Sequence, residues 1–151
     1  MVEAVFAIRP KYAEAIYDGR KRIEWRYKVP SRDDITRVWL YETNGIRRVT
    51  GWFKFSGITP RVDYKQAYDT YGPVNITGDP ETPLEYVRIL FAGRRLCGLM
   101  ITEAQRVDPF PLSKLGIISV PTSWRYVPEI DDDRERDAKM EMNTELDLAS
   151  M

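Results

Sequence analysis

The sequence predicts an α+β fold: a small, partly open mixed β-barrel of five to six strands, with two to three helices packed around it. The chain has 151 residues, the usual size of one domain, and 43% of them are apolar, which is enough to bury a core. Short apolar or alternating runs, typical of strands, are interleaved with short segments of helical periodicity. Many short strands combined with few helices fit a small open barrel.

The first part of the chain predicts four strands and one helix. The helix is expected to begin at Pro10, which suits a first helical position, and to end at Gly19. Apolar and charged side chains alternate in the second strand, which predicts a half-buried strand with one charged face. The four strands are predicted at residues 5–8, 22–29, 37–41 and 49–58.

The second part predicts two helices and then two extended segments. A helix at residues 64–71 is expected to start after a cap at Asp63. Residues 82–85 (Thr-Pro-Leu-Glu) predict a capping box that starts the next helix, and Gly93 is expected to end it. The extended segments are predicted at residues 96–107, as the central strand of the sheet, and at residues 121–127.

The chain is predicted to divide near Pro128 into a domain at residues 1–128 and an acidic, disordered tail at residues 129–151. The tail holds nine acidic and three basic residues, a net charge of −6, so the rest of this neutral chain carries +6. A basic domain with an acidic terminal segment is typical of proteins that bind polyanions. The tail is a candidate docking segment for a protein partner, although many acidic tails only aid solubility.

Composition excludes several kinds of site. The chain has no histidine and one cysteine, Cys97, which excludes His-dependent triads, His-ligated zinc, CxxC clusters and internal disulfides. No run approaches the roughly 20 apolar residues of a membrane span, and no secretory signal is visible. We therefore expect a reduced, cytoplasmic protein with no metal, no cofactor and no membrane association.

The densest charged segment is residues 19–28, GRKRIEWRYK. The period of two places four charged side chains on one side of the strand: Arg22, Glu24, Arg26 and Lys28. A carboxylate flanked by guanidinium groups stays ionised, so Glu24 is a candidate to orient an arginine or to accept a hydrogen bond from a base. Trp25 and Tyr27 fall on the opposite face and are assigned to the core. A solvated strand face explains the charges equally well.

Lys21 is the candidate base or nucleophile. It lies where the first helix gives way to the strand, and desolvation beside arginines would lower the pKa of its amine. Asp79 or Glu81, in a glycine- and proline-rich loop, would supply a partner carboxylate. Loop solvation and helix capping are the commoner roles of such acids, and most surface lysines take no part in chemistry.

A second candidate for nucleic-acid binding lies near the end of the domain, at Ser123, Trp124 and Arg125. Serine and arginine beside a tryptophan can bind a phosphate and stack a base together. Core packing is the more frequent role of such a tryptophan.

Several motifs, taken in order, resemble the ASCH family of the PUA-like superfamily over about residues 4–127. Gly19 to Arg26 match its G-x-K-x-x-E-x-R signature and follow a strand and a helix, as in the family. The later blocks that resemble the family are residues 49–53, 83–93, 109–112 and 123–126. The resemblance implies a β-barrel whose cleft takes RNA or a modified nucleobase and is lined by Lys21, Glu24 and Arg26.

One branch of the family hydrolyses acetylcytidine with a lysine, a threonine three positions later and a distant glutamate. Lys21 matches the lysine, whereas Glu24 stands where that branch has threonine, and only Asp79 loosely matches the distant acid. Other relatives have been linked to ribonuclease activity and to transcriptional coactivation. Membership of the family therefore leaves the chemistry open.

Three functions follow. The first is binding of RNA or a nucleotide derivative by a basic cleft around residues 19–28. Its candidate ligand-binding residues are Arg20, Lys21, Arg22, Glu24, Arg26, Lys28, Ser123, Trp124 and Arg125. The alternative is a hydrolase of acetylcytidine or RNA, with Lys21 as base or nucleophile and with Glu24 and Asp79 as further candidate catalytic residues. The third is a protein-interaction adaptor that docks through the tail.

Overall fold

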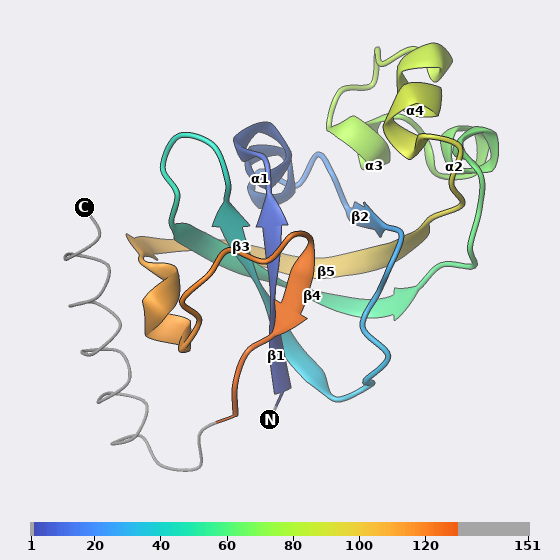
Figure 1. Ribbon diagram of the computed structural model, residues 1–151. Helices are drawn as coiled ribbons and strands as arrows, with labels where there is room; N and C mark the ends of the chain where they lie inside the picture. The colour runs from blue at the N-terminus through green and yellow to red at the C-terminus, as the bar shows by residue number, and fades with distance from the viewer. Residues whose placement is uncertain (1, 130–151) are drawn as a thin grey trace. The chain divides into compact units, whose positions relative to one another are not determined.

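The computed structural model describes residues 2–129 and shows an α+β protein with one mixed sheet (Figure 1). The strands are β1 (Val2–Ile8), β2 (Ile23–Arg26), β3 (Ile35–Glu42), β4 (Val49–Ile58), β5 (Cys97–Phe110) and β6 (Trp124–Tyr126). The helices are α1 (Pro10–Tyr17), α2 (Tyr64–Tyr71), α3 (Val74–Thr77), α4 (Leu84–Phe91) and a short 3₁₀ helix, η1 (Leu112–Leu115). The predicted fold class is confirmed. The predicted tail lies outside the described residues, except for Glu129.

The sheet has the strand order β2-β5-β4-β3-β1-β6. β1 pairs in parallel with β3 and antiparallel with β6, while β2 pairs antiparallel with β5. The prediction that β5 is the central strand is wrong, because β5 is second from the β2 end of this order. Its apolar run is buried at residues 97–99, where it pairs with β2, and not at the middle of the sheet.

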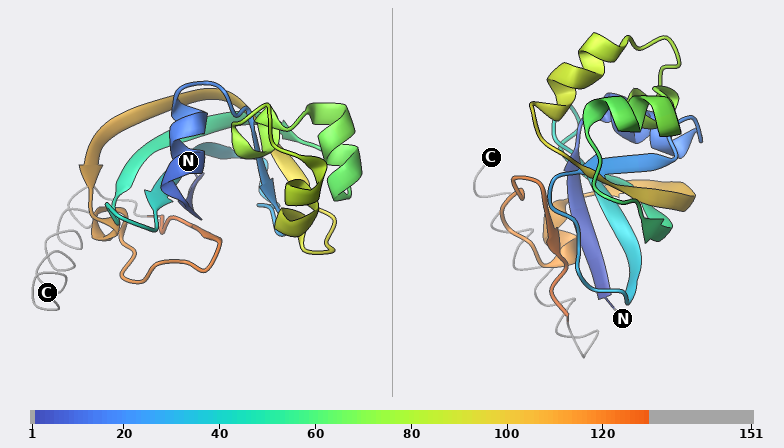
Figure 2. Two further views of the ribbon diagram at one scale, coloured as in Figure 1. Left: turned by 90° about the horizontal axis from the view of Figure 1, so that it is seen from above. Right: turned by 90° about the vertical axis from the view of Figure 1, so that its right-hand side faces the viewer.

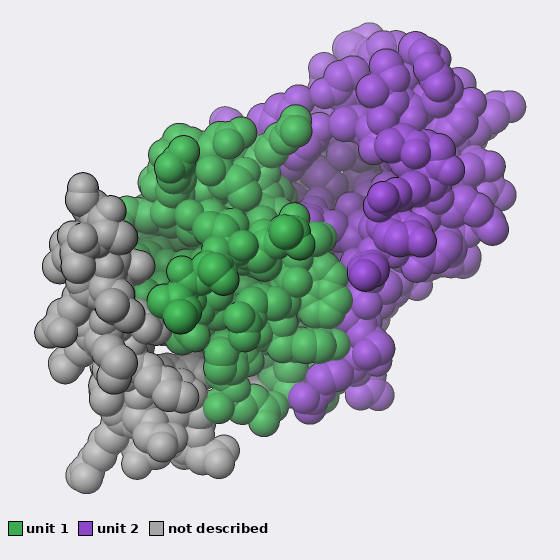
Figure 3. Space-filling model, in the orientation of Figure 1, with its two compact units in different colours: residues 1–10, 34–52, 105–151 green, residues 11–33, 53–104 purple. Residues whose placement is uncertain are grey.

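The chain forms two compact units, coloured separately in Figure 3. Unit 1 contains residues up to 10, residues 34–52 and residues from 105 onward. Its core packs β1 and β3 side chains such as Val5 and Trp39 against Leu112 and Leu115 of η1. β1 is buried along almost its whole length, and both of its edges are paired.

Unit 2 contains residues 11–33 and 53–104, and its core lies under α2, α3 and α4, which are neighbours in all views of Figures 1 and 2. The predicted cap of α2 is confirmed. Asp63 Oδ1 accepts from the Gln66 backbone N–H at 2.8 Å, and Gln66 Oε1 accepts from the Asp63 N–H at 3.0 Å. The three tyrosines of α2 pack against the core beside buried Ala67.

Three local predictions in unit 2 are wrong. Thr82 does not cap α4, because its hydroxyl pairs with the Thr77 hydroxyl at 2.6 Å and α4 starts after Pro83. α3 stands where a loop was expected. Tyr27, predicted to lie in the core, is 48% exposed. β2 ends at Arg26, so the alternation of buried and exposed side chains does not extend to Tyr27. Among residues 2–129, no helix has the length and apolarity needed to cross a membrane.

Candidate functional site

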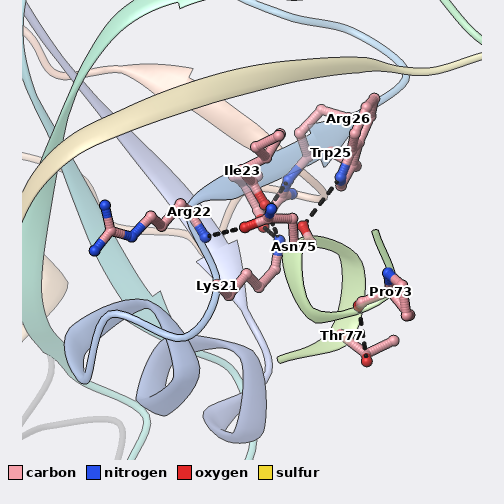
Figure 4. Close-up of polar contacts among 9 residues, drawn as sticks. Lys21, Arg22, Ile23, Trp25, Arg26, Pro73, Asn75 and Thr77 are labelled. Carbon is pink, nitrogen blue, oxygen red and sulfur yellow. Dashed lines mark hydrogen bonds and ion pairs between the residues drawn. The ribbon is translucent and has the colours of Figure 1, made fainter. Parts of the chain in front are cut away.

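The segment that joins α1 to β2 is held at three points. Gly19 has φ +85°, the left-handed conformation predicted for it, which glycine adopts without strain, and it lies two positions after Tyr17, the last residue of α1. The Lys21 N–H then donates to the Ala15 carbonyl at 3.0 Å. The Arg22 N–H donates to Asn75 Oδ1, also at 3.0 Å, which ties the segment to α3 (Figure 4).

Lys21, Glu24 and Arg26 form one chain of buried ion pairs. Lys21 Nζ lies 3.1 Å from Glu24 Oε1, and Arg26 Nη2 and Nε each lie 2.8 Å from Glu24 Oε2. The Lys21 ammonium also donates to the Ile23 carbonyl. Lys21 is 2% and Glu24 5% exposed, so a solvated strand face does not describe these two residues. The structure therefore brings together the three residues of the sequence signature.

Burial and pairing shift both pKa values of the buried pair. Burial lowers the pKa of the Lys21 amine, and the favourable field of Glu24 only partly opposes it. For Glu24, burial alone would raise the pKa of the carboxyl, but Lys21 and Arg26 outweigh burial and the pKa is lowered. Glu24 thus stays ionised, while Lys21 gives up its proton more readily than an exposed lysine does.

The opposite face of β2 belongs to the core of unit 2. Ile23 and Trp25 are buried there, as predicted for Trp25, and the ring of Trp25 packs edge-on against Tyr71. The Trp25 indole N–H donates to the Asn75 carbonyl at 3.1 Å. Arg22 and Lys28, at either side of the strand, are exposed.

A pocket of about 160 Å³ lies beside Lys21 in unit 2. Lys21 and Arg22 line it from the segment before β2, Tyr17 lines it from α1, and residues 101–104 line it from β5. Figure 4 shows the Arg22 side chain extending away from Asn75. The pocket therefore offers cationic donors, one aromatic ring, the hydroxyl of Thr102 and the carboxylate of Glu103, which lies 3.8 Å from Lys54 Nζ. It is smaller than the roughly 300–1,000 Å³ of drug-sized sites, so it suits a single base or phosphate group.

Arg20 and Asp79 line a different pocket of unit 2, of about 410 Å³. Arg20 Nη1 donates to the Gly78 carbonyl at 3.0 Å, and Arg20 Nε lies 2.8 Å from Asp18 Oδ2. Asp79 Oδ1 accepts from the Glu81 N–H at 2.9 Å, a turn-stabilising contact within the loop. Asp79 therefore does not line the pocket that contains Lys21.

Ser123, Trp124 and Arg125 lie in unit 1. The Ser123 carbonyl accepts from the Ala7 N–H at 2.9 Å, which places the segment against β1. The Trp124 ring stacks on Phe6, with centroids 5.9 Å apart, so it takes the packing role that its sequence also allowed. Arg125 is exposed, and its Nε donates to the Tyr126 carbonyl at 3.1 Å.

Sequence reasoning missed Asn75, the residue that joins α3 to the candidate site. Its amide side chain accepts from Arg22 and donates to the Tyr71 carbonyl at 2.9 Å, while its own carbonyl accepts from Trp25. The residues that flank α3 did indicate a short helix at this position. Pro73 before the short helix and Gly78 after it are the usual start and stop of a helix.

Comparison with known proteins identifies the family. The family model described as the ASCH domain matches residues 6–105. A curated protein of Zymomonas mobilis subsp. mobilis, named ASCH domain-containing ribonuclease, is 31% identical over 114 residues, which cover 75% of this chain and 73% of that protein.

Solved structures agree on the fold. The crystal structure of ASCH from Zymomonas mobilis matches with a TM-score of 0.70 and 23% identity, and covers 93% of this chain and 94% of the other. A serine-to-alanine variant of that protein matches with the same TM-score and coverage, at 22% identity. The matched region contains both the G-x-K-x-x-E-x-R signature and the pocket beside Lys21, and this chain belongs to the ASCH domain family.

Proposed function

We propose that this protein binds single-stranded RNA and that the pocket beside Lys21 receives one nucleotide of it. The observation that carries the proposal is the membership of the ASCH family, in which a relative 31% identical to this chain is named a ribonuclease. The chemistry of the pocket supports the same conclusion. Cationic donors next to an aromatic ring are the combination that single-stranded nucleic acids require, for phosphates and bases respectively.

Each side chain of the pocket has a defined role in this proposal. Arg22 makes one long contact of 3.4 Å from Nε to the Gly19 carbonyl, so its terminal nitrogens are available to a phosphate. Lys21 uses two of its three ammonium donors on Glu24 and Ile23, which leaves one for a base or a phosphate. Tyr17 is half-buried and supplies the ring for stacking. Glu24 and Arg26 position Lys21 and do not line the pocket.

RNA binding is tested by titrating a labelled single-stranded RNA over a range of salt concentrations. We expect Arg22→Ala to weaken binding several-fold at low salt and to reduce the slope of log K against log salt by about 0.7, the value of one lost phosphate contact. The matched control is Lys65→Ala, which removes one exposed cation on α2 that lines neither pocket. Equal effects of the two variants would contradict the proposal.

Hydrolysis of RNA is the second candidate function. It is favoured by the ribonuclease name of the relative and by the lowered pKa of Lys21, since a buried amine that loses its proton readily can act as a general base. The acetylcytidine activity of one branch requires a threonine that this chain replaces with Glu24, so RNA is the better substrate to test first.

We expect Lys21→Met to abolish turnover of RNA or acetylcytidine, whichever the wild-type protein cleaves. Thermal melting checks that the variant folds, and the pH–rate profile of the wild-type protein should report an amine with a lowered pKa. Turnover that survives the substitution would remove Lys21 from the mechanism. RNA binding without turnover would leave the first proposal as the function.

A further inference from the structure

An exposed tyrosine is surrounded by arginines at the far end of β2. Tyr27 follows the strand directly, and the guanidinium carbons of Arg94 and Arg61 lie 4.7 Å and 5.4 Å from the centroid of its ring. Arg95 belongs to the same cluster. It follows Arg94 in the chain, and its Nη2 donates to the Arg61 carbonyl at 3.0 Å. We call Arg61, Arg94 and Arg95, together with Tyr27, the arginine patch. All four residues belong to unit 2.

The patch is held in place by hydrogen bonds to backbone. Arg61 Nη1 donates to the Tyr27 carbonyl at 2.8 Å and to the Arg95 carbonyl at 2.9 Å. One guanidinium therefore joins three segments that are far apart in sequence. Because these bonds and the ring contacts restrict the side chains before any ligand arrives, little rotamer freedom remains to be lost on binding.

Among the described residues, no carboxylate pairs with the charges of the patch. Within residues 2–129, none of Arg61, Arg94 and Arg95 forms an ion pair, and all three are exposed. Each guanidinium has five N–H donors, and only a few of them are used on carbonyls. Like charges held together in this way repel one another, and an anion with several acceptor oxygens would relieve the repulsion.

We propose that the arginine patch binds the phosphate backbone of the RNA whose nucleotide enters the pocket beside Lys21. This inference rests on the proposed function. β2 connects the two sites directly, since Arg22 at its start lines the pocket and Tyr27 follows its end. Five residues of extended chain span about 17 Å, a distance that a strand of a few nucleotides covers. Arg94 contacts a phosphate, and Tyr27 positions Arg94 and Arg61 through its ring.

The test compares two lengths of single-stranded RNA, a dinucleotide and an oligomer of about a dozen nucleotides, the latter within the site sizes of single-strand binding domains. We expect Arg94→Ala to weaken binding of the longer RNA about five- to tenfold and to lower its salt slope by about 0.7. The dinucleotide, which is too short to reach from the pocket to the patch, should bind as before. Lys65→Ala serves again as the control, because it removes one exposed cation on α2 that belongs neither to the patch nor to a pocket.

Substitution of Tyr27 separates positioning from folding. Tyr27→Ala should weaken binding of the longer RNA about as much as Arg94→Ala. Tyr27→Phe keeps the ring and should bind this RNA with the affinity of the wild-type protein. Melting curves of each variant confirm that the fold is intact.

The outcomes distinguish the two proposals. A wild-type protein that binds neither RNA overturns the proposed function and this inference with it. Binding that depends on Arg22 but is unchanged by Arg94→Ala overturns the arginine patch alone. Equal weakening of both RNA lengths by Arg94→Ala would also overturn it, because the patch would then not be a separate contact.

Discussion

Glu24 accepts a different cation on each of its carboxylate oxygens, Lys21 on Oε1 and Arg26 on Oε2. The arrangement is the reason that a lysine can be 2% exposed in this protein. Removing a buried charge from water costs several kcal/mol, and only a paired carboxylate with good geometry offsets that cost. At the level of single residues, Glu24 therefore decides whether Lys21 stays at the edge of its pocket.

Replacing Glu24 should destabilise the protein strongly. We expect Glu24→Gln to lower the free energy of unfolding by about 3 kcal/mol at pH 7, because Lys21 and Arg26 lose the carboxylate that compensates them. Denaturant unfolding measures the loss. Glu103→Gln is the control, since the Glu103 carboxylate is exposed and lies 3.8 Å from Lys54 Nζ, and its loss should change stability little.

The stability difference between the wild-type protein and Glu24→Gln should depend on pH with a definite sign. The pKa of Glu24 is lower in the folded than in the unfolded protein, so its stabilising effect is complete above the unfolded value of about 4.3. The effect is lost as the pH falls through the lower, folded value. The difference in unfolding free energy between the wild-type protein and Glu24→Gln should therefore narrow in acid. A constant difference from pH 7 to pH 3 would contradict the assigned role.

At the level of elements, β2 is a four-residue strand at one end of the sheet order, and it relies on its neighbours. Within residues 2–129 it pairs only with β5, and Asn75 of α3 binds it through the Trp25 indole and binds Arg22 just before it. Gly98 makes the pairing with β5 close. A Cβ at residue 98 would lie 2.4 Å from Ile23 Cγ2 and 3.2 Å from the Trp25 ring.

We expect Gly98→Ala to destabilise the protein by about 1–3 kcal/mol, because the added methyl group would force Ile23 and Trp25 out of their packed positions. Thermal or denaturant unfolding measures the effect. Gly57→Ala in β4 is the matched control, since a Cβ there meets no atom within 4 Å. Similar losses for the two substitutions would show that the close approach of β2 and β5 is unimportant for stability.

At the level of the whole molecule, the separation of charge along the chain bears on RNA binding. Residues 129–151 carry −6 and the remainder +6. Residues 130–151 lie outside the described part of the structure, so the docking role of the tail remains a prediction from charge alone.

Removing residues 129–151 should strengthen RNA binding, because a net charge of −6 that competes with phosphate is lost. The affinity is measured in the same RNA titration, and the gain should shrink as salt screens the charges. A truncated protein that binds RNA no better than the full chain would assign the tail to solubility or to a protein partner.

Much of this protein was determined by sequence alone, because helix starts, caps and strand alternation depend on residues close to one another in the chain. The cap at Asp63, the left-handed Gly19 just after α1 and the burial of Trp25 are of this kind. The signature from Gly19 to Arg26 likewise indicated the family before any comparison.

Only the tertiary structure decided which distant residues meet. Asn75 reaches β2 across 50 residues, Arg61 and Arg94 converge on Tyr27, and Asp79 lines a different pocket from Lys21. Local periodicity carries no information about such contacts, because they depend on how strands pair and helices pack. Burial has the same origin: a charged strand face looks identical in sequence whether water or protein covers it.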